Sequence, residues 1–116
     1  GDWADGPDNI TYSAFFTADG SGAINCEVDD NATDQAAASG VTATAAQWKI
    51  YRIDCTDLDD IRFYIDGVHV ATGTTFEYAA TGANAILQPY FGPYKASGTG
   101  VGTIQVDYMR VWAERS

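Results

Sequence analysis

The stretch Asp60–Thr72, DIRFYIDGVHVAT, carries the clearest strand and turn pattern of this 116-residue chain. Its first half alternates apolar and polar residues, which is the pattern of a strand with one buried and one exposed face. Asp66 and Gly67 then supply the two positive-φ residues that a two-residue type I′ turn needs. This turn places Ile65 opposite Val68 and keeps the apolar residues on one face. The stretch therefore predicts a β-hairpin.

The hairpin register also fixes which side chains share a face. Phe63 falls opposite Val70 on the apolar face, and Tyr64 falls opposite His69 on the outer face. His69 is the single histidine of the chain, and local spacing builds no zinc site or catalytic triad around it. We therefore expect Tyr64 and His69 to be surface residues.

Strand patterns also occur on both sides of the hairpin. They cover Ile10–Ala18, Ala23–Asp30, Gln47–Cys55, Thr74–Ala79, Ala85–Phe91 and Ile104–Trp112. Thr, Val, Ile, Tyr and Phe are abundant and Leu is nearly absent, which favours strands over helices. The sequence therefore predicts an all-β fold, an antiparallel two-sheet β-sandwich or jelly roll. Its length indicates a single domain over residues 1–116, with Gly1–Asn9 as an irregular N-terminal segment.

The segment Asp30–Ala46 consists of Asn, Asp, Thr, Ala, Ser and Gly with few larger side chains. Its Ala-rich centre, Gln35–Ser39, has no apolar stripe wide enough for a packed helix. We expect a long surface loop here, and loops of this length are either functional or mobile.

Charge and hydropathy exclude several classes of partner. The formal net charge is −10, and the six Lys and Arg residues are scattered. Nucleic acids and anionic bilayers attract clustered basic residues, so we expect neither as a partner. No apolar run approaches the roughly 20 residues of a membrane span. The chain begins at Gly1 without a signal peptide, and we expect a fragment, a processed product or the ordered part of a longer chain.

The two cysteines do not fix a redox compartment. If Gly22–Asp29 pairs in a simple hairpin with Trp48–Asp54, the residue opposite Cys26 lies near Lys49, several positions from Cys55. A disulfide would then need an asymmetric loop or a different pairing. We favour two buried thiols over a disulfide.

Three pieces of the chain carry a family resemblance: QWKIYRID at 47–54, IRFYIDGVHVA at 61–71, and the closing IQVDYMRVW at 104–112. In this order, with a Gly-rich loop before the last piece, they resemble the C-terminal half of the concanavalin A-like lectin/glucanase sandwich. That superfamily includes laminin-G-like modules, legume-type lectins and family 16 glycoside hydrolases. Within it, the chain most resembles modules of tailed-phage virion proteins.

The resemblance implies a concanavalin A-like sandwich that lacks its N-terminal part, because the full fold is usually longer. Its closing strand normally pairs with a strand from near the N-terminus, and an unpaired edge invites another chain. We therefore expect either residues before Gly1 or a partner strand from a neighbouring subunit. A bare, solvated edge over Ile104–Trp112 would contradict both expectations.

The resemblance to family 16 hydrolases bears on catalysis. Those enzymes carry an E-x-D-x-E strand whose carboxylates line the cleft, and Glu27 and Asp29 match the first two positions. The third position is Asn31, which cannot supply the general acid that glycoside hydrolysis requires. We therefore expect no enzymatic activity and no catalytic residues.

Two acidic clusters could hold a cation. Hard oxygen ligands at this density suit Ca²⁺, which no other feature of the sequence requires. The first cluster is Asp29, Asp30, Asn31 and Asp34, and the second is Asp54, Asp57, Asp59 and Asp60. The first lacks the Gly and terminal Glu of an EF-hand loop, so a solvated loop is its favoured interpretation. Asp and Asn are ordinary turn formers, so the second is favoured as a turn.

The segment PYFGPYK at 89–95 gathers aromatic side chains around a turn. Most aromatics of the chain are expected in the core, where they dominate packing. The residues of this cluster could instead stack on a sugar or contact another subunit, and the sequence leaves both open. They are Tyr90, Phe91, Tyr94 and Lys95.

These observations predict a non-catalytic structural module of a phage-like particle. It would be a capsid decoration or cement protein on the virion surface, acting through contacts with other subunits in an oligomer or lattice. The alternative is an extracellular carbohydrate-binding module, with Ca²⁺ as its possible cation. A glucan hydrolase that depends on Glu27 is the third hypothesis.

Overall fold

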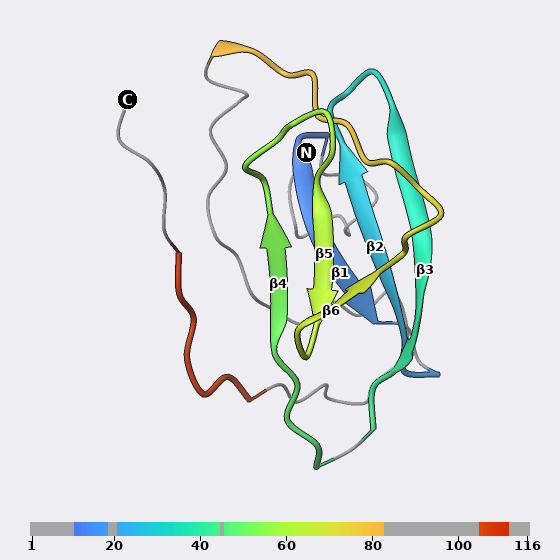
Figure 1. The fold of residues 1–116 in the computed structure, drawn as a ribbon, viewed down its shortest axis with the longest axis vertical. Coiled ribbons are helices and arrows are strands. Elements are labelled where there is room, and N and C mark those ends of the chain that lie inside the picture. The colour runs from blue at the N-terminus through green and yellow to red at the C-terminus, as the bar shows by residue number, and fades with distance from the viewer. Residues whose placement is uncertain (1–10, 19–20, 45, 83–104, 112–116) are drawn as a thin grey trace, which may run out of the picture.

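A computed structural model describes residues 11–18, 21–44, 46–82 and 105–111 of the chain. These residues form two antiparallel three-stranded sheets, one lying in front of the other in Figure 1. The first sheet has the order β1-β2-β3 and contains β1 (Ser13–Ala18), β2 (Ala23–Asp29) and β3 (Asp34–Thr42). The second has the order β4-β5-β6 and contains β4 (Tyr51–Asp54), β5 (Arg62–Ile65) and β6 (Val68–Val70). The predicted all-β, two-sheet architecture is confirmed.

The predicted hairpin is β5 and β6 with the expected register. Phe63 pairs with Val70, Tyr64 with His69 and Ile65 with Val68. Asp66 and Gly67 have φ angles of 52° and 81°, the positive values that the turn requires. One detail differs: Val68 is exposed, although it shares the apolar face with the buried Ile65.

Phe63 is the centre of the core. It has 0 % exposure, and its ring lies edge-on to Phe16 of β1 and to Phe76, with centroid distances of 5.1 and 4.9 Å. The contact with Phe16 joins the two sheets. Edge-to-face aromatic pairs contribute about 0.5–1.5 kcal/mol beyond their burial. The other buried hydrophobic residues of the cluster are Ile24, Cys26, Val28, Ile61, Ile65, Val70, Phe76 and Tyr78.

The expected surface loop over Asp30–Ala46 is wrong, because most of it forms β3. This strand pairs with β2 along its length, interrupted by a register shift. Its burial alternates residue by residue, with Gln35, Ala37 and Val41 among the half-buried positions. Small side chains hide this alternation in the sequence, since an Ala on the buried face and an Ala on the exposed face look the same.

Two other strand predictions are correct only in part. The strand expected over Gln47–Cys55 is reduced to β4, which pairs with β5 and not with β2. The segment Thr74–Ala79 forms a single bridge, between Phe76 and Ile61, in place of a strand. Its backbone still lies beside the residues that precede β5, because the Tyr78 N–H donates to the Leu58 carbonyl at 2.8 Å.

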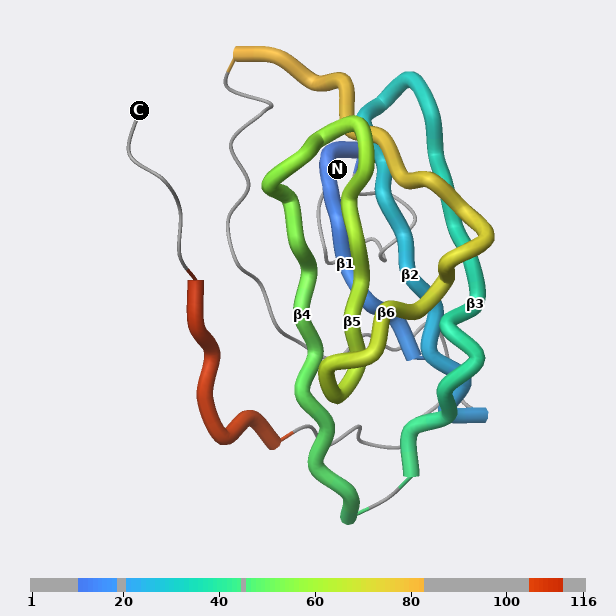
Figure 2. The backbone as a smooth tube through the Cα atoms, in the orientation of Figure 1, coloured from blue at the N-terminus to red at the C-terminus, as the bar shows by residue number. Residues whose placement is uncertain are grey.

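The closing strand expected over Ile104–Trp112 is wrong for its described part. Residues 105–111 form no strand, and all of them are exposed. Figure 2 shows this segment, in orange-red, lying apart from both sheets. It is not the edge of a sheet, so it supplies no support for the expected partner strand.

Side chains of the first sheet hold the segment that follows β6. The Gln35 amide donates from Nε2 to the Thr75 carbonyl and accepts at Oε1 from the Glu77 N–H, both at 2.8 Å. The Asp30 carboxylate accepts the Ala79 N–H at 2.9 Å. These bonds connect the β2–β3 end of one sheet with the β6 side of the other.

In the part of the chain that the structure describes, no helix is long and apolar enough to cross a membrane. Three predictions lie outside the described residues: the strand over Ala85–Phe91, the irregular segment Gly1–Asn9 and the start of the strand over Ile10–Ala18.

Candidate functional site

Three side chains form a row across the exposed face of the second sheet. Arg52 of β4, Tyr64 of β5 and His69 of β6 lie opposite one another in the strand register. The Arg52 guanidinium carbon lies 5.1 Å from the centroid of the Tyr64 ring. The centroid of the His69 ring, on β6, lies 5.4 Å from the same Tyr64 centroid. A cation over an aromatic ring is attracted by the ring quadrupole, so this row is an ordered surface feature.

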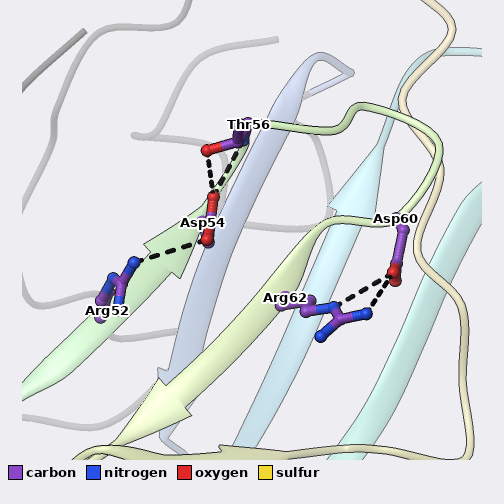
Figure 3. Close-up of polar contacts among 5 residues, drawn as sticks. All are labelled: Arg52, Asp54, Thr56, Asp60 and Arg62. Carbon is purple, nitrogen blue, oxygen red and sulfur yellow. Dashed lines mark hydrogen bonds and ion pairs between the residues drawn. The ribbon is translucent and has the colours of Figure 1, made fainter.

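Beside this row is a polar depression of about 200 Å³ at the carboxyl end of β4. Figure 3 shows the charged side chains of this region, which come from β4, from the turn after it and from the start of β5. The residues that line the depression are Asp54, Thr56, Asp57, Asp60, Arg62 and Tyr64.

Arg62 is held by Asp60 within the depression. Its Nε and Nη2 atoms donate to Oδ2 of Asp60 at 3.1 and 2.9 Å. This hydrogen bond, followed by the interaction with Tyr64, raises the pKa of the Arg62 guanidinium. The pair is exposed, so solvent screens it and it adds little to stability.

Asp54 closes the turn after β4. It accepts the Thr56 N–H at 3.0 Å and the Thr56 hydroxyl at 2.6 Å, and it pairs with Arg52 at 3.4 Å. The hydrogen bonds from Thr56 lower the pKa of the Asp54 carboxyl, and the charges of Arg52 and Arg62 add to the effect. Asp57 accepts the Asp59 N–H in the same way. This acidic cluster therefore behaves as a turn whose carboxylates bond locally.

The amino end of β4 carries a second feature, which we call the edge patch. It comprises the large apolar side chains of Trp48 and Ile50, with exposures of 65 and 61 %. The next residue, Tyr51, points to the other face of the sheet, where its ring lies 5.1 Å from that of Phe16 in β1. Ile50 is fixed by its neighbours, because its N–H donates to Asp66 Oδ1 and its carbonyl accepts the Asp66 N–H, both at 2.8 Å. The edge patch is therefore an apolar surface on a rigid part of the second sheet.

The residues predicted to hold Ca²⁺ lie at the β2–β3 turn. Asp30 is buried, and its carboxylate accepts the N–H groups of Ala32, Thr33 and Ala79. Asp29 accepts the Asn31 N–H at 2.8 Å. Within the described ranges, no group of three or more His, Cys, Asp or Glu side chains could hold a metal ion. Asp29, Asp30, Asn31 and Asp34 therefore act in the turn, and calcium binding by them stays a prediction.

The backbone hydrogen bonds to Asp30 have an electrostatic effect. The bond from Ala79, and then those from Thr33 and Ala32, lower the pKa of the Asp30 carboxyl. A carboxylate that accepts several N–H groups is stabilised in its charged form. Asp30 is thus an ionised structural group.

The residues that match the hydrolase pattern do not share one strand. Glu27 and Asp29 belong to β2, which ends at Asp29. Asn31 follows in the left-handed region with a φ of 68°, so its side chain leaves the alternation of the strand. The structure does not bring the three positions into one row.

The two cysteines do not form a disulfide in the structure. Both cysteines are free; Cys26 is buried as expected, but Cys55 is exposed, so that half of the expectation is wrong. Tyr90, Phe91, Tyr94 and Lys95 lie outside the described residues.

Sequence reasoning missed the edge patch. The pattern predicted a strand over Gln47–Cys55, whereas the strand begins at Tyr51. A usable signal was present: Trp48 and Ile50 alternate with Lys49 and share the spacing of the outer-face Arg52. An apolar residue on that face has no core to enter.

Comparison with models of known families, with curated proteins and with solved structures found no match for this chain.

Proposed function

We propose that this protein is a non-catalytic structural module that works through contacts with other protein subunits. The observation that carries the proposal is the edge patch, in which Trp48 and Ile50 are both largely exposed just before β4. Grouped apolar side chains, unlike single ones, mark interaction surfaces. Aromatic residues such as Trp and Tyr also provide much of the binding energy at protein interfaces.

The fold type and the setting of the module belong to the same proposal. The resemblance of 47–54 and 61–71 supports a concanavalin A-like sandwich of the kind found in tailed-phage virion proteins. In that setting the chain is a decoration or cement protein on the surface of a phage-like particle. The net charge of −10 suits a protein that binds other subunits and not nucleic acid.

The absence of catalysis is supported by the β2–β3 turn. Asn31 replaces the acid of the hydrolase pattern, and it follows the end of β2 in a left-handed conformation. A substrate placed along β2 would meet no general acid at this position. We expect no glucanase activity from the unchanged chain in an assay with a soluble β-glucan, and such activity would contradict the proposal. If activity were found, Glu27→Gln would show whether it depends on Glu27.

The test of the structural role is co-migration with particles. The chain, labelled at its N-terminus, is mixed with phage-like particles purified from the organism that encodes it and separated on a sucrose gradient. We expect the label in the particle fraction and its loss, at least tenfold, in Trp48→Ala/Ile50→Ala. The matched control is Tyr108→Ala, which removes an aromatic side chain with similar exposure from residues 105–111. A label that stays at the top of the gradient would contradict the role.

A carbohydrate-binding module is a second candidate, favoured by the polar depression beside Tyr64. It combines the ring of Tyr64 with guanidinium and carboxylate groups, which offer an apolar face and hydrogen-bonding groups to a polar ligand. A glycan array read with and without EDTA tests this candidate and the calcium prediction together. Arg62→Ala should abolish any binding at the depression, and binding that survives this change would place the ligand elsewhere.

A further inference from the structure

β4 is an edge strand. Among the described residues it is paired with β5 on one side only. The backbone of Ile50 points at β5, because its N–H and carbonyl both bond to Asp66. Successive residues of an antiparallel strand point to opposite sides. The N–H and carbonyl groups of Tyr51 and Ile53 therefore point away from β5, at the open edge.

β3, which pairs with β2 alone in the described part, is a poorer edge for association. A register shift interrupts its pairing with β2, and Gly40 within it has a φ of 78°. Bulges and irregular backbone are devices that protect edges from pairing with another chain. β4 is regular, and the apolar side chains of the edge patch lie beside it. Of these two edges, β4 is the one suited to a partner strand.

We propose that two copies of this chain associate by antiparallel pairing of β4 with β4, around a two-fold axis through Ile53. The two second sheets then form one continuous sheet, with β4 of each copy at its centre. This inference names a partner for the surface that we propose to be functional, and its biological use rests on that proposed function. The pairing itself rests on the geometry of the edge.

Several registers would bring the outward-pointing N–H and carbonyl groups of Tyr51 and Ile53 opposite a second copy. The charges of Arg52 and Asp54 favour the register with the axis through Ile53. An axis through Tyr51 places Arg52 opposite Ile50 of the second copy, and an axis through Arg52 places two arginines opposite each other. An axis through Ile53 places Arg52 opposite Asp54 of the second copy, and the symmetry repeats this pair. Opposite charges directly across strands stabilise a sheet, and like charges destabilise it. Both side chains already face each other within one copy, at 3.4 Å, and are partly exposed.

The edge is short, since β4 has four residues. Small interfaces of this kind belong to weak or transient complexes. We expect a dissociation constant on the order of micromolar, with the edge patch contributing apolar contacts beside the new pairing.

The test uses charge reversal and sedimentation velocity from 1 to 300 μM, concentrations chosen to bracket that constant. Arg52→Glu alone and Asp54→Arg alone should each be monomeric, with dimer affinity at least tenfold lower, because each creates like-charge pairs. An equimolar mixture of the two variants should dimerise, since both cross-strand pairs are then of opposite charge. The matched control, Arg110→Glu, makes the same charge reversal at an exposed residue outside both sheets and should dimerise like the unchanged chain. An unchanged chain that is monomeric at every concentration, or a folded mixture that stays monomeric, would overturn the proposal.

A second measurement needs no variant, because Asp54 also holds the turn at Thr56 and its replacement can impair folding. Amide hydrogen exchange is followed by NMR on the unchanged chain at low and high concentration. The Tyr51 and Ile53 N–H groups should become protected only at high concentration, whereas those of Arg52 and Asp54 are protected at both. Equal exchange of Ile53 at both concentrations would contradict pairing through this edge.

The two proposals fail in distinguishable ways. A chain that dimerises through β4 but does not co-migrate with particles would remove the particle role and leave the dimer. A chain that co-migrates but shows no concentration-dependent protection of Ile53 would remove the dimer and leave the particle role.

Discussion

The Asp30 carboxylate accepts the backbone N–H of Ala79, which lies 49 residues further along the chain, at 2.9 Å. The same carboxylate bonds to Ala32 and Thr33 in its own turn. One buried side chain therefore shapes the β2–β3 turn and fixes the segment after β6 to it.

Asp30→Asn should destabilise the protein by about 2–3 kcal/mol, because the amide offers one acceptor oxygen and turns its NH₂ group toward backbone donors. Urea unfolding followed by circular dichroism measures this change. The control is Asp59→Asn, which makes the same substitution at an exposed site of the acidic turn and should change stability by less than about 0.5 kcal/mol. Equal effects of the two substitutions would show that Asp30 does not have this structural role.

Stability should decrease in acid. The folded-state pKa values of Asp30 and Asp54 are lowered, chiefly by hydrogen bonds from backbone N–H groups and from Thr56. A carboxyl with a lowered pKa contributes its full stabilisation above the unfolded-state pKa of about 3.9, and loses it as pH falls toward the folded-state value. We expect the contribution of these two carboxyls to the free energy of unfolding to be constant near neutral pH and to decrease below about pH 4. Asp30→Asn should show a shallower fall in the same titration, and an unchanged slope would contradict the assignment.

The two thiols should react at very different rates. Burial, and secondly the charge of Glu27, raises the pKa of Cys26 to about 11, whereas Cys55 is exposed. With Ellman's reagent under native conditions we expect one thiol per chain to react, and the second to react only in denaturant. Cys55→Ser should abolish the native reaction. The pKa of Cys55 is also raised, by desolvation and then by Asp54, so its rate should keep increasing above pH 9. Two equally fast thiols would contradict the burial of Cys26.

Two glycines offer a matched test of the turns. Gly67 and Gly22 both have positive φ angles, of 81° and 84°, but only Gly22 is crowded, since a Cβ there would lie 2.7 Å from the Ala43 carbonyl oxygen. Gly67→Ala should cost about 1–2 kcal/mol for the left-handed conformation. Gly22→Ala should cost clearly more, because the backbone must also move. Thermal unfolding compares the two, and a smaller loss for Gly22→Ala would show that the turn after β1 adapts without strain.

The sequence was most informative where a structural preference is local. The turn of Asp66 and Gly67 and the alternation around Phe63 determine the hairpin from within thirteen residues, and its register is confirmed. The buried face of β2 was also predictable, because Ile24, Cys26 and Val28 differ clearly from the polar residues between them.

The sequence was least informative where a strand depends on a distant partner. β3 is built largely of Ala, Ser and Gly, and its extended form comes from pairing with β2. The role of Asp30 is equally hidden, since nothing near it in the sequence indicates a bond to Ala79. The position of Trp48 and Ile50 outside a strand also follows from how β4 meets β5.

The Gln35 side chain has a consequence for the order of folding. It bonds to residues 40 and 42 positions later in the chain, Thr75 and Glu77. The hairpins on either side can form from neighbouring residues, but these bonds must wait until the chain has been synthesised beyond them. Long-range contacts of this kind slow the search for the native state, so folding is expected in milliseconds to seconds. Until then Phe76 and Tyr78 are missing from the buried cluster, and a ribosome paused before residue 75 would leave this part of the core open to chaperones.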